Sequence, residues 1–292
     1  PGLEIRILCW DFSPVYATER ELLTRFKLDW GGHERLHFRF DDHHPVGGSL
    51  HEKLVVVDDR VAFIGGIDLG PRRWDTTDHR PDDDRRRSPG GSPYRPFHDP
   101  QAVVEGDVAR ALGDLARDRW QRAAGESVTP ASREHGPWPR DVTADIEDLE
   151  IGLVRTRPAT DDAEAMTHTL RFHERIFDRA QSHIYAENQF LTSDAIGNAL
   201  ARTLRRDDGP EILLVTAKEN SGWLEIAIMG GLRARFCRRL RDADPSGRLE
   251  IMYPEIADGT WPNVHSKLTL VDERWAYVGS ANFADRSMGL DT

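Results

Sequence analysis

The chain has 292 residues, of which 38% are apolar and 30% charged, and its formal net charge at pH 7 is −11. This length suffices for a buried core, and two cysteines, Cys9 and Cys237, exclude a disulfide framework. No apolar run reaches the ~18–20 residues of a membrane-spanning helix. The acidic balance disfavours duplex DNA as a partner, because phosphate binding requires a basic surface.

Strands and helices alternate in the first part of the chain. Apolar runs and period-two patterns predict strands at residues 4–10, 35–40, 53–57 and 61–64, the last two joined as a hairpin. Helical periodicity predicts helices at residues 18–28 and 105–122. Residues 76–96 are rich in turn-forming and charged side chains, which is typical of a surface loop.

The second part of the chain has the same organisation. The patterns predict strands at residues 151–155, 182–186, 211–217, 248–253, 267–271 and 275–278. They predict helices at residues 163–181, 193–206 and 223–242. We therefore predict an α/β fold with two halves, each a mixed β-sheet flanked by helices. The N-terminal half is residues 1–122, the C-terminal half is residues 149–292, and residues 123–148 connect them.

One polar pattern occurs in both halves. His51, Lys53 and Asp58 match His265, Lys267 and Asp272 as H-x-K-x4-D, and the two motifs are 214 residues apart. A glycine follows each histidine by 14 residues, and Asp68 or Asn282 follows it by 17. The chain contains only four lysines, and two of them lie in this repeat. A chance match therefore does not explain the pattern.

The residue types in the repeat suit phosphoryl chemistry. Residues i and i+2 of a strand share a face, so each histidine points the same way as its lysine. A neutral imidazole can attack phosphorus, and a protonated imidazole can donate to the leaving oxygen. Two ammonium groups can balance the charge on the phosphate oxygens, so we expect neither a metal nor another cofactor. Asp58 and Asp272 lie beside the turns, where we expect structural roles.

These motifs resemble the signature of the phospholipase D superfamily, a duplicated HxKxxxxD. Residues 65–79, 97–99, 184–190 and 282–292 further resemble the branch of eukaryotic phospholipases D and their bacterial relatives. The resemblance implies a monomer whose two halves are related by a pseudo-twofold axis, with the active site at their interface.

The resemblance also implies roles for individual residues. His51 would be the nucleophile that forms a phosphohistidine, and His265 the general acid and then the base, although these two roles could be exchanged. Lys53 and Lys267 would hold the phosphate, together with Asp68, Asn282, Gly66 and Ser280. Asp99 matches the acid expected to orient His51.

The acid expected for His265 normally follows the Asp-Thr pair with which this chain ends. Asp291 is the nearest substitute within the sequence. This departure, together with the abrupt start in a strand, predicts a fragment cut at both ends.

Weaker signals surround the predicted cleft. Glu187, Asn188 and Gln189 end a predicted strand and are candidate pocket residues, as are Trp74, Asp75 and His79. Each of them could equally be a structural polar or packing residue. His43 and His44 could indicate a metal site, but they are better explained as loop residues near the mouth of the cleft.

The resemblance predicts a phosphodiesterase that acts on phospholipids at a membrane surface, with water or an alcohol as acceptor. A cardiolipin-synthase-like phosphatidyltransferase is an alternative, because both activities share the first half-reaction. A nuclease of the same superfamily is a weaker alternative, and nucleic acid is not the expected partner. A non-catalytic binding module is a third, against which the two intact motifs argue. The predicted location is cytoplasmic or at the periphery of a membrane.

Overall fold

The computed structural model describes residues 2–10, 33–131, 138–160, 163–219, 223–256 and 259–292. The predicted helix at residues 18–28 lies outside the described residues. Within the described part of the chain, no helix combines the length and the apolar character that crossing a bilayer requires.

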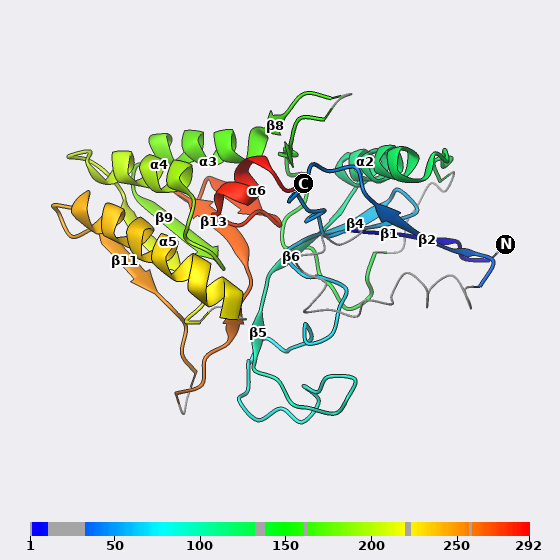
Figure 1. The fold of residues 1–292 in the computed structure, drawn as a ribbon, viewed down its shortest axis with the longest axis horizontal. Helices are drawn as coiled ribbons and strands as arrows, with labels where there is room; N and C mark the ends of the chain where they lie inside the picture. The colour runs from blue at the N-terminus through cyan, green and yellow to red at the C-terminus, as the bar shows by residue number, and fades with distance from the viewer. Residues whose placement is uncertain (1, 11–32, 132–137, 161–162, 220–222, 257–258) are drawn as a thin grey trace.

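In the described part of the N-terminal half there are two small sheets and one helix (Figure 1). Strands β1 and β2 pair in parallel, and an antiparallel sheet has the strand order β3-β4-β6. Helix α2 packs against β2, β3, β4 and β6. The elements are β1 Ile5–Trp10, β2 Leu36–Asp41, β3 Leu54–Val57, β4 Val61–Gly65, β5 Phe97–His98, β6 Gln101–Glu105 and α2 Asp107–Ala124.

The C-terminal half is built on a five-stranded mixed sheet with the order β11-β10-β9-β13-β14. Strands β9, β10 and β11 are parallel, and β13 runs antiparallel to both of its neighbours. The strands are β7 Thr156–Arg157, β8 Met166–Thr167, β9 His183–Asn188, β10 Glu211–Val215, β11 Leu249–Met252, β12 Asn263–Val264, β13 Lys267–Val271 and β14 Trp275–Val278. The helices are α3 His168–Arg179, α4 Asp194–Leu204, α5 Trp223–Asp242 and α6 Asp285–Gly289.

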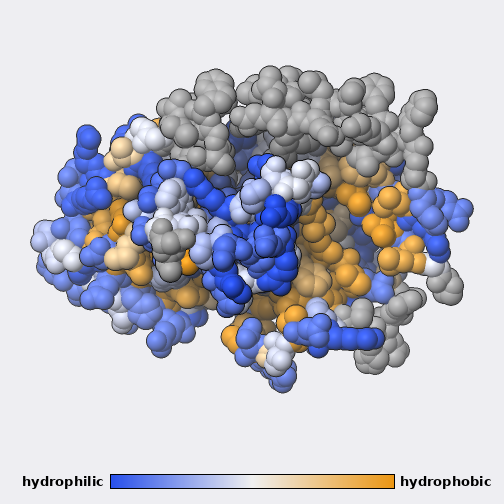
Figure 2. All heavy atoms as spheres, turned by 90° about the horizontal axis from the view of Figure 1, so that it is seen from below, coloured by the Kyte–Doolittle hydropathy of each residue, from blue (hydrophilic) through white to orange (hydrophobic). Residues whose placement is uncertain are grey.

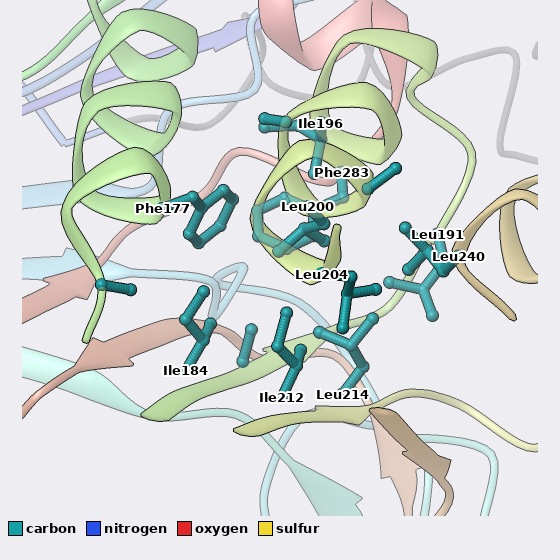
Figure 3. Close-up of a cluster of buried hydrophobic side chains, with 14 of the residues drawn as sticks. Phe177, Ile184, Leu191, Ile196, Leu200, Leu204, Ile212, Leu214, Leu240 and Phe283 are labelled. Atoms are coloured by element: carbon teal, nitrogen blue, oxygen red, sulfur yellow. The ribbon is translucent and has the colours of Figure 1, made fainter. Parts of the chain in front are cut away.

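The main hydrophobic core lies between this sheet and helices α3, α4 and α5 (Figure 3). Phe177 of α3 and Leu200 of α4 are fully buried against Ile184 of β9 and Ile212 of β10. Burying such a side chain contributes roughly 1.5–3 kcal/mol. The sheet is therefore a firm base for the residues at its edges.

The α/β class predicted from the sequence is confirmed, and so are most of its strands and helices. The predicted strand at residues 151–155 is wrong, because those residues are irregular and the only pairing there is the short β7–β8 ladder. The predicted helix at 163–181 is shorter, because residues 166–167 form β8. Strands β5, β6 and β12 were missed. The pseudo-twofold relation of the halves stays a prediction.

The loop at residues 76–96 is organised around a buried arginine. Arg86 is 1% exposed and donates to Asp75 Oδ1 (2.9 Å), to the Pro81 carbonyl (2.9 Å) and to the Tyr94 carbonyl (3.2 Å). Figure 2 shows the face of the molecule on the side of this loop. The centre of that face is largely hydrophilic, and apolar side chains gather to the right of the centre. The ion pair between Arg86 and Asp75 therefore stabilises the conformation of this loop.

The two hairpin turns of the repeat have the same backbone conformation. Asp58 and Asp59 have φ of 52° and 56°, and Asp272 and Glu273 both have φ of 53°. The Asp272 carboxylate accepts the backbone N–H groups of residues 181, 182 and 183 at 2.8–3.0 Å. Although burial opposes it, these hydrogen bonds lower the pKa of Asp272. Asp272 therefore fixes the chain entering β9.

Replacing Asp272 by alanine should lower the free energy of unfolding by about 1–3 kcal/mol, because three backbone donors lose their acceptor. Urea denaturation followed by circular dichroism measures this change. Asp208→Ala is the matched control, since that side chain is 85% exposed and contacts only Arg206 in the described chain. Equal stability of the two variants would contradict the structural role.

Candidate active site

Each motif histidine follows a short strand pairing between the two halves. The backbone N–H of His265 donates to the carbonyl of His98 (2.8 Å), where β5 and β12 run in parallel. The backbone N–H of His51 donates to the carbonyl of Thr292 (2.8 Å), whose own N–H donates to Ser49 (3.0 Å). Residues from each half therefore hold the histidine of the other half.

The two lysines have equivalent backbone contacts. Lys53 Nζ donates to the carbonyl of His51 (2.7 Å), and Lys267 Nζ donates to the carbonyl of His265. Lys53 also pairs with Asp68 (3.3 Å), and Lys267 Nζ lies 3.0 Å from His265 Nδ1. Both ammonium groups are thus held beside the imidazole two residues earlier.

Mutual electrostatic effects show that both motifs form one site. Burial, followed by the charges of Lys53 and Lys267, holds the pKa of His51 well below its usual range. Burial and the charges of Lys267, Arg73 and Lys53 do the same for His265. Burial also lowers the pKa of Lys53, and it lowers that of Lys267 to about 7. The imidazoles are therefore neutral at pH 7, and the surrounding charges favour an anionic ligand.

The acid expected for His51 instead contacts the other histidine. Asp99 Oδ2 lies 2.7 Å from Nδ1 of His265, whereas His51 Nδ1 is buried with no hydrogen-bond partner among the described residues. The predicted pairing of Asp99 with His51 was wrong because β5 crosses to pair with β12, which leads directly into His265. Burial raises the pKa of Asp99 to about 7.

Asp291, the nearby substitute considered for the acid of His265, has other partners. Its carboxylate accepts from Ser49 Oγ (2.8 Å) and pairs with Arg286 (2.8 Å). Asp291 thus anchors the end of the described chain to the segment that leads into His51.

Two residues expected to face the phosphate have other contacts. Asp68 forms ion pairs with Lys53 and with Arg73 (3.1 Å), and these outweigh burial to lower its pKa. An anionic carboxylate in that place orients the Lys53 and Arg73 cations, and its contact with a phosphate stays a prediction. Gly66 leaves room for Asp99, since a Cβ atom there would lie 2.3 Å from Asp99 Oδ1.

The corresponding residues of the second motif lie close to His51 and in the core. A backbone hydrogen bond with Ser280 partly offsets the fall in the His51 pKa. Asn282 is 5% exposed, and its Oδ1 is buried without a partner in the described part of the chain. At this motif position, two ion pairs hold Asp68, whereas the Oδ1 atom of Asn282 has no partner among the described residues.

The candidate pocket residues divide into different roles. Gln189 Oε1 lies 3.4 Å from Lys267 Nζ, and Glu187 contacts His98 (2.8 Å). Asn188 Oδ1 accepts the backbone N–H of Phe283 (2.8 Å), which is a structural bond. Trp74 is 46% exposed and lies under the Arg85 guanidinium. Gln189 and Glu187 are thus tied to the site, whereas Asn188 and Trp74 are not.

Sequence reasoning gave no role to Arg73 or His98, and it named His79 only as a residue that could shape the pocket. Arg73 pairs with Asp68 and lies over the ring of Phe97, 5.1 Å from its centroid. His79 and His98 contact each other at 3.0 Å. All three lie in the segment between the first motif and Asp99, and its concentration of polar residues was the available signal. Among the described residues, no group of three or more His, Cys, Asp or Glu side chains is arranged to hold a metal ion.

Comparison with known proteins agrees with this geometry. Residues 174–292 match the family model "Cardiolipin synthase, PLD-like domain". The chain is 23% identical to phospholipase D A of Dictyostelium discoideum over 98% of this chain and 27% of that protein. It is also 23% identical to phospholipase D alpha 1 of Vigna unguiculata over 98% of this chain and 52% of that protein.

These sequence similarities support the phospholipase D superfamily as the family of this chain. The fold resembles the crystal structure of phosphatidylserine synthase from Haemophilus influenzae, with a TM-score of 0.58 and 14% identity, over 99% of this chain and 67% of that one. The chain spans about a quarter and about half of the two phospholipases named above.

In this candidate site, Gly66→Ala should displace Asp99 and remove its hydrogen bond with His265 Nδ1. Turnover of a soluble chromogenic phosphodiester should then fall by at least about tenfold. Gly70→Ala is the matched control, because a Cβ atom there meets nothing within 4 Å. Turnover and unfolding are measured for both variants. Unchanged turnover in Gly66→Ala would show that Asp99 does not need its present position.

Proposed function

We propose that this chain is a phosphodiesterase of the phospholipase D type, which cleaves phospholipid head groups through a phosphohistidine. The observation that carries this proposal is the convergence of two imidazole–lysine pairs in one buried site. The superfamily match and the names of the phospholipase relatives support a phospholipid as substrate.

In the first half-reaction, His51 is the nucleophile. Its ring is neutral, and no carboxylate among the described residues bonds its Nδ1, so a nitrogen lone pair is available for attack. The P–N bond forms as the P–O bond to the head group breaks. Lys53 and Lys267 balance charge on the non-bridging oxygens.

His265 supplies the proton for the departing head group. Asp99 accepts from Nδ1, which leaves Nε2 for the substrate and stabilises the imidazolium. A bound phosphodiester anion offsets the lysine charges, so it raises the tendency of His265 to hold this proton. After the proton is transferred, the neutral ring is ready to act as a base.

In the second half-reaction, His265 removes a proton from water or an alcohol, whose oxygen then attacks phosphorus. The P–N bond breaks and the electron pair returns to His51. Water gives phosphatidic acid, and an alcohol gives a transferred phosphatidyl group. The cardiolipin-synthase description of the matching model and the fold of the synthase neighbour favour the transferase as the second candidate.

The nucleophile can be identified with a phosphatidyl ester of p-nitrophenol, whose departure needs no general acid. His265→Asn should release a burst of about one p-nitrophenol per protein and then stall, because the intermediate lacks its base. His51→Asn should show no burst. Both variants should lose at least about a thousandfold in steady-state turnover of phosphatidylcholine vesicles.

A burst confined to His51→Asn would exchange the two roles. Wild-type turnover without an acid-labile phosphatidyl linkage to histidine would contradict covalent catalysis. Adding ethanol or glycerol to wild-type reactions separates the two candidates. Predominant phosphatidic acid would identify a hydrolase, and predominant phosphatidyl-alcohol a transferase.

A further inference from the structure

A line of four side chains links the two halves beside the candidate active site. Asp75 Oδ2 lies 2.9 Å from His79 Nδ1, and His79 Nε2 lies 3.0 Å from His98 Nδ1. His98 Nε2 lies 2.8 Å from Glu187 Oε2. We call Asp75, His79, His98 and Glu187 the histidine bridge. It runs from the loop after the first motif to strand β9 of the C-terminal half.

The contacts of the bridge determine how many protons it holds. The two carboxylates accept, so His79 Nδ1 and His98 Nε2 both carry hydrogen. Two neutral rings have no further N–H, and their remaining lone pairs would then face each other at 3.0 Å. The central contact is a hydrogen bond only with a third proton, and a fourth would place two N–H groups face to face. The intact bridge therefore contains one imidazolium.

The surroundings favour this extra proton. The hydrogen bond to Glu187 raises the pKa of His98, against the effect of burial. Hydrogen bonds from His98 and Tyr185 overcome burial and lower the pKa of Glu187 to about 2. Other titratable and charged groups face the bridge. Arg86 and Tyr94 lie near Asp75, and Tyr185 lies beside Glu187. Asp99 is next to His98, and Arg73 and His265 both contact the ring of Phe97.

The bridge holds the strand that presents Asp99. Strand β5 has only two residues, and so short a strand needs contacts beyond its ladder. The N–H of Phe97 donates to Asp75 Oδ2 (2.8 Å), and the ring of His98 is held by His79 and Glu187. The carbonyl of His98 accepts from His265, and Asp99 follows directly. A shift of His98 would therefore move both partners of His265.

We propose that His79 and His98 share one extra proton, and that this proton positions Asp99 and His265 by tying the loop to strand β9. His79, His98 and Glu187 are then positioning residues. The role in turnover depends on the function proposed above, whereas the shared proton does not. Below the midpoint of its titration the bridge is intact. As the pH rises through the midpoint, the central hydrogen bond is lost.

Nitrogen-15 NMR of the histidine rings in the whole chain tests the proton count. We expect the pair to hold one extra proton, and the titration of His98 to have a midpoint above that of an ordinary histidine, because the hydrogen bond to Glu187 raises its pKa. In His79→Gln the amide donates to neutral His98, so the His98 midpoint should fall by about one unit. Two neutral rings in the wild type at pH 6, or an unchanged midpoint in His79→Gln, would overturn the proposal.

The N–H resonance of His265 Nδ1 reports on positioning without any need for activity. In the wild type, the low-field signal of its bond to Asp99 should weaken above the bridge midpoint. In His79→Gln the signal should persist, because the bridge no longer needs a third proton. A wild-type signal that does not change across the midpoint would show that the bridge does not position Asp99.

Turnover supplies the last comparison. In the wild type, kcat should fall as the pH rises through the bridge midpoint, and His79→Gln should lose this step. Glu187→Gln should lower kcat at pH 7 by about 10–100-fold with KM changed less than about twofold. Glu219→Gln is the matched control and should stay close to wild type, because that side chain is 57% exposed and pairs with Arg95 outside the bridge.

The two proposals fail in different ways. If the wild type turns over no phosphodiester but the two NMR results hold, the proposed function fails and the bridge stands. If the wild type is active but its alkaline step is unchanged in both His79→Gln and Glu187→Gln, the bridge proposal fails and the function stands.

Discussion

The burial of two ammonium groups in one site is the constraint on which the rest of the structure depends. Isolated from water, such charges are costly unless they are hydrogen-bonded and balanced. Lys53 has the His51 carbonyl and Asp68, and Lys267 has the His265 carbonyl, Gln189 and the nearby Asp99. The balance is incomplete, so the imidazoles stay neutral, and in the proposed reaction a phosphodiester anion would supply the missing negative charge.

Short backbone pairings between the two halves make this arrangement possible. Because β5 pairs with β12, the acid that orients His265 comes from the other half of the sequence. The pairing of Thr292 with Ser49 and His51 has the same pattern. Local sequence could place each histidine at the start of a strand, but only tertiary pairing decides which acid meets which ring. This explains why Asp99 was assigned to the wrong histidine.

Much of the fold could still be predicted from periodicity. The bounds of α5, β13 and β14 agree with their apolar patterns, and the repeat indicated the four motif residues. Strands β5 and β12 have two residues each and are formed by pairing with one another. A local sequence pattern could therefore not reveal them. Gly66 was expected to admit a ligand, whereas it admits Asp99. The sequence pattern requires a small residue there but does not identify its neighbour.

The segment between the first motif and Asp99 is better understood as a scaffold than as a lid. Arg86 is buried in it and holds Asp75, and Asp75 in turn bonds His79 and the backbone of Phe97. Separating Arg86 from Asp75 would leave a buried charge unpaired at a cost of about 3–5 kcal/mol, so a rearrangement within this segment is costly. The same segment also carries Arg73, which pairs with Asp68 beside Lys53. Movement of this segment would therefore disturb the charges of the site itself.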